Sequence, residues 1–594
     1  MTLRPDNPLI VQSDRTMMLH TVRAVFDDKG SQAKDPDGQP LTEEHPRYAQ
    51  ARDALGAFAE LEKSPNYLHT YRVTPVSVWN AAALGMTARD IDQTLQEFAC
   101  VPVPASVTEV IRQWVERYGV LRIERRERAG SDAHFELLSA EPGVLEDVLG
   151  YREVAQLTEK DASGRVWITD LSRGSVKHAL IKVGFPVDDQ GGYLDGDHLE
   201  IKLRAKTRAG QDFAVRKYQE QAAAAFHAGG TVLGGNGVVA LPCGAGKTVV
   251  AMQVMSLVQT KTLILTTNTV AVRQWHQELL DKTELTEDQV GEYTGDNKDV
   301  KPVTITTYQM LTWRRSKTSA FEHFAIFGQE NWGLVVYDEV HLLPAPVFRV
   351  TADLQARRRL GLTATLVRED GKEDEVFCLI GPKRFDVPWK VLEGQGFIAA
   401  ATCVEVRVPL GSALRADYQA ADARGKFRVA SENPAKLDVV RDLLAKHQTG
   451  RVLIIGQYIA QVELFSKELG APLITGKTPN SERETLYGAF RDGSEPLLIV
   501  SKVGNFAIDL PDANVAIQIS GTFGSRQEEA QRLGRILRPK SDGSAAVFYS
   551  VVTGGSRDQE FAEKRQLFLT EQGYSYQIIE SQGLTNSLSN GGSC

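Results

Sequence analysis

The stretch Gly237 to Met252, GVVALPCGAGKTVVAM, decides the fold. Its apolar run breaks into Pro242-Cys243-Gly244-Ala245-Gly246-Lys247-Thr248 and then becomes apolar again, which predicts a strand, a phosphate-binding loop and a helix. Glycines let backbone N–H groups converge on phosphate oxygens, while Lys247 supplies a cation and Thr248 a hydroxyl for Mg²⁺. Leu241 stands where the strict G-x-x-x-x-G-K-[ST] pattern has its first glycine. This stretch alone therefore leaves open a glycine-rich turn that binds nothing.

Around this loop, apolar strands alternate with amphipathic helices, which is the pattern of a parallel sheet covered on both faces. The expected strands are 237–241, 262–266, 303–306, 334–337 and 359–363, and the expected helices are 247–258 and 269–281. A second α/β unit follows, with expected strands at 451–455, 472–475, 496–500, 514–519 and 545–550. The sequence predicts an α/β protein with two tandem parallel-sheet lobes.

Two further strand ends carry polar residues where such a sheet binds its ligands. One is Thr363-Ala364-Thr365, at the end of the strand 359–363, whose small hydroxyl residues could bridge the nucleotide site to a moving second lobe. The other is Asp338-Glu339, after the strand 334–337. Asp338 would hold Mg²⁺ through the waters of the metal, and Glu339 would orient and polarise the attacking water. An Asp-Glu pair can also be a solvated strand end, but the preceding phosphate loop favours catalysis.

In the second unit, Gln531, Arg535 and Arg538 are spaced to share one face of a helix. Two guanidinium groups on one face suit a γ-phosphate whose charge spreads during transfer. A solvent-facing basic helix is the alternative.

The first 200 residues show a different pattern. A helical pattern runs from Tyr48 to Leu61, and Thr74-Pro75, Thr87 and Ser106 are expected to begin three helices. A hairpin with strands at 120–125 and 134–138 follows, so these residues predict a winged-helix-like unit. Its arginines could reach DNA phosphates, but interleaved glutamates make a solvated hairpin an equally good interpretation. Residues 142–205 predict a small α+β domain to which no chemistry can be assigned.

Composition limits the possible settings. The chain has 594 residues, 42% of them hydrophobic and 24% charged, and its formal net charge is −8, so any nucleic-acid site must be local. No apolar run approaches the roughly 18 residues needed to span a bilayer. We see no secretion signal, and the five cysteines are scattered without close pairs. These features favour a reducing cytoplasm and no membrane role.

Taken together, several motifs give the chain a close resemblance to superfamily 2 helicases of the XPB type, in particular their bacterial members. They are Arg216-Lys217-Tyr218-Gln219, LPCGAGKT at 241–248, Gln274-Trp275, Thr306-Thr307-Tyr308-Gln309, YDEVHLLPA at 337–345, GLTATLVRED at 361–370, VSKVGNFAIDLP at 500–511 and GSRQEEAQRLGRILRP at 524–539. The resemblance implies two RecA-like lobes behind the winged-helix-like and small α+β domains.

The predicted domains are 1–140, helical and winged-helix-like; 141–208, small α+β at the position of a damage-recognition domain; 209–395, first helicase lobe; 396–435, a short linker or thumb-like region; 436–580, second lobe; and 581–594, a tail.

The resemblance also implies roles for residues that spacing alone does not assign. Gln219, with Arg216 beside it, should read adenine, Asp509 should approach the ribose, and Arg535 and Arg538 should act as arginine fingers. Arg368-Glu369-Asp370 resembles the loop implicated in separating strands. From motif position we expect contacts with DNA phosphates near Gln274, Thr307 and Lys502.

The resemblance implies an ATP- and Mg²⁺-dependent DNA motor that moves 3′ to 5′, for which nucleotide excision repair is the favoured setting. Its expected partners are single-stranded, forked or damaged duplex DNA, with a repair nuclease as a further candidate, and a monomer is expected. The region from about Leu410 to Ser431 is shorter than the thumb-like insertion of many relatives, which weakens the expectation of processive unwinding. A duplex translocase and an ATP-gated scaffold that recruits a nuclease remain alternatives, and RNA is a weaker option.

Overall fold

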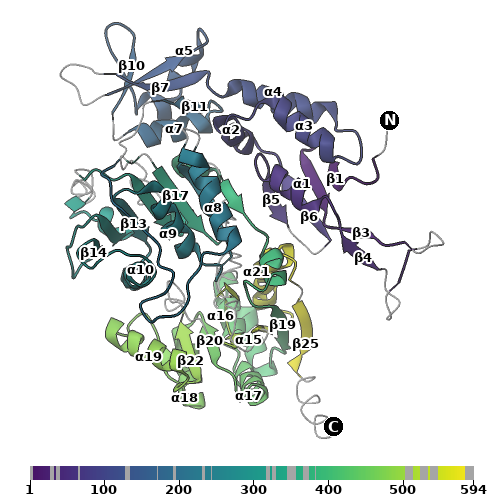
Figure 1. The fold of residues 1–594 in the computed structure, drawn as a ribbon. Coiled ribbons are helices and arrows are strands. Elements are labelled where there is room, and N and C mark those ends of the chain that lie inside the picture. Colours follow the sequence, from purple (N-terminus) through teal and green to yellow (C-terminus); the bar gives the residue numbers. More distant parts are fainter. Residues whose placement is uncertain are drawn as a thin grey trace. The chain divides into compact units, whose positions relative to one another are not determined.

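The computed structural model describes residues 4–26, 32–34, 41–63, 67–126, 134–169, 172–190, 196–230, 234–242, 244–315, 322–323, 330–343, 356, 358–364, 373–381, 383–501, 513–521, 533–534, 546–574 and 576–581. They form two compact units, the first built mainly from residues up to Asp386 and the second mainly from Val387 onward (Figure 1). Among the described helices, none is long and apolar enough to cross a membrane.

The chain begins with an antiparallel sheet of strand order β1-β2-β6-β5. These strands are β1 (Leu9–Val11), β2 (Thr16–His20), β5 (Glu60–Lys63) and β6 (Leu68–Arg72), and β3 (Val22–Ala24) pairs separately with β4 (Thr42–Glu44). Four helices accompany the sheet: α1 (Tyr48–Leu55), α2 (Pro75–Ala83), α3 (Ala88–Phe98) and α4 (Ala105–Arg117). Apolar side chains from the sheet and all four helices form one buried cluster.

The helix starts in this region test the capping predictions. Thr74 and Thr87 each accept a hydrogen bond from the backbone N–H three residues later, so both predicted caps are confirmed. Ser106 was the wrong cap, because α4 begins at Ala105 directly after Pro104. The helix expected from Tyr48 ends at Leu55, and Glu60–Lys63 is a strand instead.

A second sheet has the order β11-β7-β8-β10-β9. It contains β7 (Leu121–Arg125), β8 (Phe135–Ser139), β9 (Glu159–Lys160), β10 (Val166–Ile168) and β11 (Val187–Asp189), with α5 (Val144–Leu149), α6 (Arg152–Ala155) and α7 (Arg173–Lys182). The hairpin β7-β8 thus pairs with later strands rather than acting as the wing of the preceding helices. The reason is its apolar alternation, because Leu121, Ile123, Phe135 and Leu137 pack with Val166 and Ile168 in one core.

The first lobe holds a seven-stranded sheet in which every pairing is parallel, in the order β14-β15-β13-β16-β17-β12-β18. Its strands are β12 (Asn236–Ala240), β13 (Thr262–Thr266), β14 (Val290–Tyr293), β15 (Val303–Thr307), β16 (Leu334–Asp338), β17 (Arg358–Thr363) and β18 (Lys383–Asp386). The helices are α8 (Lys217–His227), α9 (Lys247–Val258), α10 (Thr269–Lys282), α11 (Tyr308–Leu311) and α13 (Glu373–Ile380), with short 3₁₀ turns η1 (Ala228–Gly230) and η2 (Val340–Leu342).

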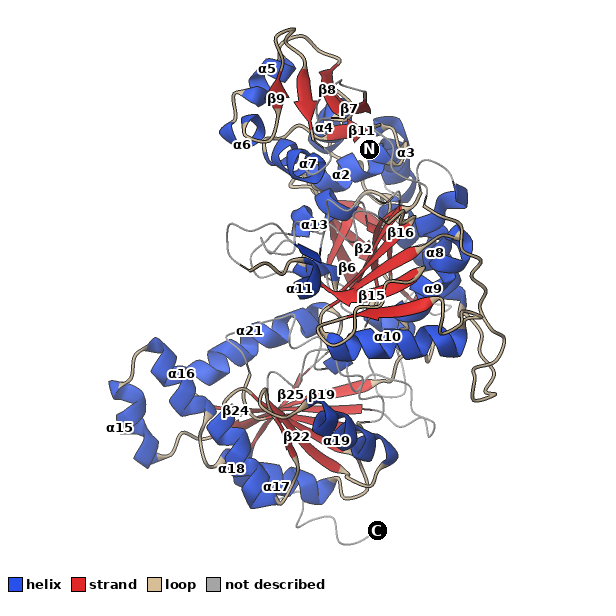
Figure 2. Cartoon of the chain, turned by 90° about the vertical axis from the view of Figure 1, so that its left-hand side faces the viewer, coloured by secondary structure: helices blue, strands red, loops and turns tan. Residues whose placement is uncertain are grey.

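Both faces of this sheet are covered, as its buried central strands require. Helices α8 and α9 pack side by side against one face, whereas α13 lies on the other (Figure 2). On the α13 side, Val238 from β12 and Val335 and Tyr337 from β16 share a core with Val376 and Ile380.

The second lobe has another all-parallel sheet, in the order β21-β22-β20-β23-β24-β19-β25. Its strands are β19 (Ala401–Val408), β20 (Val452–Gly456), β21 (Leu473–Ile474), β22 (Leu497–Ser501), β23 (Val515–Gln518), β24 (Ala546–Thr553) and β25 (Tyr576–Glu580). Its helices are α14 (Trp389–Gly394), α15 (Ser412–Ala420), α16 (Ala423–Ser431), α17 (Lys436–Lys446), α18 (Ile459–Leu469), α19 (Asn480–Asp492) and α21 (Arg557–Glu571).

The predicted fold class of two tandem parallel-sheet lobes is confirmed, and every strand predicted in the lobes is present. The strands β14, β18, β19 and β25 were not predicted. Of these, β19 matters most, because it lies inside the residues taken as a linker, 396–435, yet pairs with both β24 and β25. The part after β19 is helical, with α15 and α16, and α16 packs against α21 and β24.

Candidate functional site: the end of the first parallel sheet

The phosphate loop follows β12 directly. Leu241 and Pro242 are buried, Gly244 and Gly246 have φ of 81° and 78°, and α9 begins at Lys247. Residues with a Cβ atom rarely adopt such positive φ values, so the path of the loop requires glycine at these two positions. The predicted strand, loop and helix are therefore present.

The acid pair lies at the end of β16, two strands from β12 in the sheet. Asp338 is the last residue of the strand, and its Oδ1 accepts a hydrogen bond of 3.0 Å from the backbone N–H of Glu339. Glu339 itself has φ 52° and ψ 51°, a left-handed conformation that is costly for a residue with a side chain. This bend brings Glu339 Oε1 within 3.9 Å of Lys247 Nζ.

Two buried aromatic residues hold the Asp338 end of the strand. The indole N–H of Trp275, on α10, donates to Asp338 Oδ2 over 3.0 Å, and the hydroxyl of Tyr308, on α11, donates to the Asp338 carbonyl over 2.8 Å. Sequence analysis included both residues in motifs but gave neither a role in the site. The available signal was that Tyr308 directly follows β15 and that Trp275 lies on the helix that follows β13.

The charge state of Asp338 depends on its surroundings. Burial and the neighbouring Glu339 carboxylate raise the pKa of Asp338 to about 6, while the Trp275 hydrogen bond and Lys247 oppose the rise. Two carboxyl groups this close repel each other when both are ionised, and a bound divalent cation offsets that repulsion. The donor set of two carboxylates, a lysine and a threonine hydroxyl therefore fits a magnesium nucleotide.

His341 links the acid pair to the next strand. Its Nδ1 lies 3.3 Å from Glu339 Oε2 and 3.2 Å from the Thr363 hydroxyl, at the end of β17. His341 and Thr363 are both buried. The site therefore extends over the ends of β12, β16 and β17. Thr363 had been predicted at a strand end that could reach the nucleotide site, whereas His341 had been given no role.

Known proteins match the chain over almost its whole length. It is 48% identical over 580 residues to a Kineococcus radiotolerans protein named "DNA 3'-5' helicase XPB", covering 98% of this chain and 97% of the relative. A Mycobacterium tuberculosis protein of the same name is 47% identical, with 98% and 99% covered. This chain belongs to the XPB-type DNA helicases. It is therefore an ATP-dependent DNA helicase by family, as the motifs indicated.

More distant relatives and the family matches agree with this assignment. An Antonospora locustae protein, "General transcription and DNA repair factor IIH helicase/translocase subunit XPB", is 34% identical, with 89% of this chain and 78% of the relative covered. The family "ERCC3/RAD25/XPB C-terminal helicase" matches residues 392–590, and "Type III restriction enzyme, res subunit" matches residues 212–368. A third family, "Helicase conserved C-terminal domain", matches residues 34–162, ahead of both parallel sheets.

The remaining described residues expected for this helicase lie in the first lobe. Gln219 is buried, and its side-chain oxygen accepts a hydrogen bond of 2.9 Å from the backbone N–H of Arg216, which caps α8. Its amide nitrogen lies 3.5 Å from the Tyr218 hydroxyl. Thr307 is also buried and caps α11 through a hydrogen bond from Met310 N of 3.2 Å. Thr248 and Gln274 are half-buried, on α9 and α10.

The other predicted site residues lie outside the described residues. They are Cys243, Arg368, Glu369, Asp370, Lys502, Asp509, Gln531, Arg535 and Arg538.

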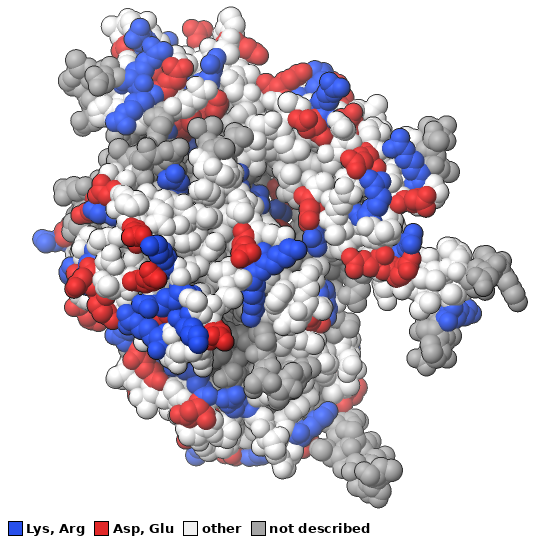
Figure 3. All heavy atoms as spheres, viewed as in Figure 1, with Lys and Arg blue, Asp and Glu red and all other residues white. Residues whose placement is uncertain are grey.

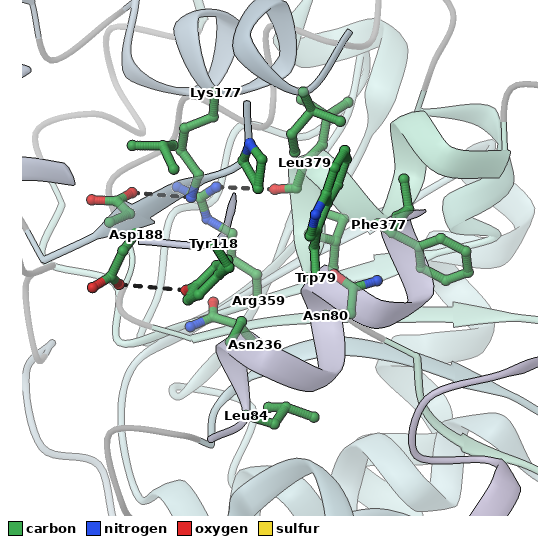
Figure 4. A pocket seen from close by; sticks show the side chains of 18 of the residues that line it. Trp79, Asn80, Leu84, Tyr118, Lys177, Asp188, Asn236, Arg359, Phe377 and Leu379 are labelled. Carbon is green, nitrogen blue, oxygen red and sulfur yellow. Dashed lines mark hydrogen bonds and ion pairs between the residues drawn. The ribbon is translucent and has the colours of Figure 1, made fainter. Parts of the chain in front are cut away.

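A separate cavity of about 220 Å³ lies at the opposite edge of the helicase sheet, where strands begin (Figure 4). Asn236 starts β12 and Arg359 is near the start of β17, while Trp79 comes from α2 and Lys177 from α7. None of the predicted site residues lines this cavity. It marks the joint at which α2 and α7 meet the first lobe.

Polar contacts surround this joint. The Tyr118 hydroxyl donates to Asp188 over 3.4 Å, and an Arg359 N–H donates to the Leu379 carbonyl over 3.2 Å (Figure 4). Burial acts to raise the pKa of Asp189, but Lys177 and Arg173 hold it well below its usual range. The Tyr118–Asp188 bond joins the residue after α4 to β11, whereas the other contacts lie within the small-sheet domain or within the lobe.

The charge distribution agrees with the weakly acidic composition. On the face shown in Figure 3, basic and acidic side chains are interspersed. The net charge of −8 leads us to seek a DNA site on this helicase in local groups of residues.

Proposed function

We propose that this helicase couples ATP hydrolysis to 3′-to-5′ movement on DNA and opens DNA in nucleotide excision repair. The observation that carries the proposal is the meeting of Lys247 with Asp338 and Glu339 at the end of the first parallel sheet, with 3.9 Å between Lys247 Nζ and Glu339 Oε1. The identity with proteins named DNA 3′-5′ helicases, over nearly the whole chain, supports DNA as the substrate and the direction of movement.

Each residue of the acid pair has its own task. Mg²⁺ bound with ATP would supply positive charge that neutralises the phosphates. Lys247 and Thr248 hold the phosphates and the ion at the start of α9, and Asp338 accepts hydrogen bonds from the waters of the ion. Glu339 polarises the attacking water, and His341, 3.3 Å from its Oε2, keeps the carboxylate in position.

Binding of the rest of the nucleotide involves both predicted lobes, 209–395 and 436–580. In the first lobe, the loop from Pro242 to Gly246 surrounds the phosphates, and Gln219, with Arg216, recognises adenine. In the second, Asp509 approaches the ribose, while Gln531, Arg535 and Arg538 stabilise the charge that develops on the γ-phosphate. The family resemblance of these motifs supports the assignments.

DNA contacts complete the proposal. Gln274, Thr307 and Lys502 contact phosphates of one strand, and Arg368-Glu369-Asp370 acts where strands separate. The domain at 141–208 occupies the position of a damage-recognition domain. We propose a cytoplasmic monomer that hands opened DNA to a repair nuclease.

Duplex translocation without strand separation is the second candidate. It is favoured by the small size of the segment after β19, where α15 (Ser412–Ala420) and α16 (Ala423–Ser431) occupy the place at which relatives carry a larger thumb-like insertion. A smaller insertion offers less surface to hold strands apart.

Two measurements test these proposals. Glu339→Gln should abolish DNA-stimulated ATP hydrolysis while retaining ATP binding, because it removes the base and keeps the volume of the side chain; an active variant would refute the catalytic assignment. Strand displacement by the wild-type protein should occur on 3′-tailed and not on 5′-tailed duplexes. ATP hydrolysis stimulated by duplex DNA without displacement on either substrate would instead establish the translocase.

A further inference from the structure

An exposed aromatic group follows α11 in the first lobe. The Trp313 side chain is 46% exposed, although tryptophan is usually largely buried. Its ring centroid lies 5.6 Å from that of His323, which lies 5.6 Å from that of Tyr293. The Tyr293 hydroxyl and His323 Nδ1 are 2.9 Å apart, so the second and third rings are fixed to each other. Trp313 is the outermost ring of this row.

Basic side chains surround the row. Arg314 and Arg315 directly follow Trp313 and are both exposed, and Arg315 pairs with Glu322 at 2.8 Å. Lys298 Nζ lies 4.6 Å from the centre of the Tyr293 ring. An exposed aromatic plane beside cations has the composition of a surface that binds single-stranded nucleic acid, because bases stack on the ring while phosphates attract the cations.

The position of Trp313 connects it to the acid pair. Its backbone N–H donates to the Met310 carbonyl over 3.3 Å, and the Thr312 hydroxyl donates to the Tyr308 carbonyl over 2.8 Å. These bonds fasten Trp313 to α11, whose Tyr308 donates to the Asp338 carbonyl. In Figure 2, α11 lies beyond the end of β15. A base held by Trp313 would therefore rest on a segment bonded to the catalytic strand.

We propose that Trp313 is a stacking platform for an unpaired base of the DNA strand on which the helicase moves, with Arg314 and Arg315 holding the adjacent phosphates. This inference rests on DNA being the substrate, and it adds a contact to those expected at Gln274 and Thr307. Thr307 is buried and caps α11, so the exposed end of this segment is at Trp313. Stacking accepts any base, as a motor that moves along arbitrary sequence requires.

The test compares DNA affinities of the full-length protein at one fixed salt concentration. Fluorescence anisotropy with a labelled oligo-dT strand and with a blunt duplex would be measured for wild type, Trp313→Ala and Trp313→Phe. We expect Trp313→Ala to raise the Kd for the single strand roughly tenfold and to change the Kd for the duplex less than about twofold, because paired bases cannot stack on the ring. Trp313→Phe should recover most of the loss.

Controls separate this inference from the proposed function. Tyr67→Ala removes another exposed aromatic side chain, 64% exposed, from the N-terminal sheet and should leave both affinities unchanged. If the wild type binds no DNA, the proposed function fails. If the wild type binds DNA and Trp313→Ala binds the single strand equally well, the platform is refuted. Equal losses on single strand and duplex also refute it, since they indicate a contact with duplex backbone, or a partner site, rather than stacking.

Discussion

Replacing Trp275 by phenylalanine should weaken Mg²⁺ binding without removing ATP binding. The change keeps a ring in the buried position but deletes the indole N–H that donates to Asp338 Oδ2 over 3.0 Å. Burial and Glu339 already raise the pKa of Asp338 to about 6, and the Trp275 bond is one of the contacts that oppose the rise. Without it, Asp338 is more readily protonated and a poorer acceptor for the waters of the ion.

The size of the effect follows from the type of bond. A hydrogen bond to a charged group contributes about 1.5–3 kcal/mol. At about 1.4 kcal/mol per tenfold, the Mg²⁺ concentration for half-maximal ATP hydrolysis should rise at least tenfold. One pKa unit corresponds to about 1.36 kcal/mol, so the pKa of Asp338 should rise by about one unit or more. Because the ionised form is the active one, activity should be lost on acidification at a pH about one unit higher than in the wild type.

The assay is steady-state ATP hydrolysis with saturating DNA, titrated with Mg²⁺ at several pH values. Trp79→Phe is a matched control, since the Trp79 indole N–H also makes a bond of 3.0 Å, to the Trp114 carbonyl, away from the acid pair. If Trp275→Phe needs no more Mg²⁺ than Trp79→Phe and loses activity at the same pH, Trp275 does not tune Asp338.

Two other predictions concern histidines. His341→Ala should lower DNA-stimulated kcat about tenfold or more while leaving the KM for ATP within about twofold, because His341 orients Glu339 and touches Thr363; equal kcat values in a phosphate-release assay would contradict this. Burial lowers the pKa of His69 to about 4, so its contribution to stability is complete above about pH 6.5 and is lost as the pH falls from there toward 4, by up to about 3 kcal/mol. Hydrogen exchange of Leu68–Arg72, corrected for intrinsic rates, should show this loss in the wild type and not in His69→Gln.

The sequence predicted the lobes well because parallel strands buried on both faces are continuous apolar runs. The phosphate loop and Asp338-Glu339 were predictable for a related reason, since their chemistry needs particular residue types next to such runs. The strands β14 and β18 were not predicted because they are four residues long and carry charged residues such as Glu292 and Lys383. In β19 the alternation of Val404, Val406 and Val408 was a readable signal, obscured by the expectation of a linker.

The supporting residues of the site could not be predicted, because their roles depend on which strands are neighbours. Trp275 and Tyr308 reach Asp338 only because β13 lies beside β16 and β15 lies beside β13. The same holds for His341, which reaches Thr363 because β16 and β17 are adjacent. Strand order is a property of the folded sheet and cannot be deduced from the local hydrophobic pattern. The misplacement of the hairpin β7-β8 has the same origin.

In the second lobe, the central strand β23 is followed directly by residues that contact buried polar groups. Lys436, fully buried, donates to the Ile519 carbonyl over 2.8 Å and pairs with buried Asp558 at 2.6 Å. The Ser520 hydroxyl donates to Gln461 over 2.6 Å. In the sequence, this strand is followed by the segment that contains Arg535 and Arg538, the proposed arginine fingers. Apolar residues could fill this space, and a buried ion pair often adds no stability over them. We therefore attribute another role to these polar groups: they fix the position at which the chain leaves the strand.

That explanation predicts a separation of stability from turnover. Lys436→Met alone leaves Asp558 buried without its cation and should destabilise the second lobe by about 3–5 kcal/mol. Lys436→Met combined with Asp558→Leu removes both charges and should recover most of that stability, because a buried pair replaced by apolar residues is often neutral. The kcat of the double variant should nevertheless stay below the wild-type value, since the position at which the chain leaves the strand is no longer fixed. Hydrogen exchange of Val515–Gln518 and ATP hydrolysis would be measured on the same samples. Wild-type kcat in a stable double variant would show that the pair has no part in placing the arginines.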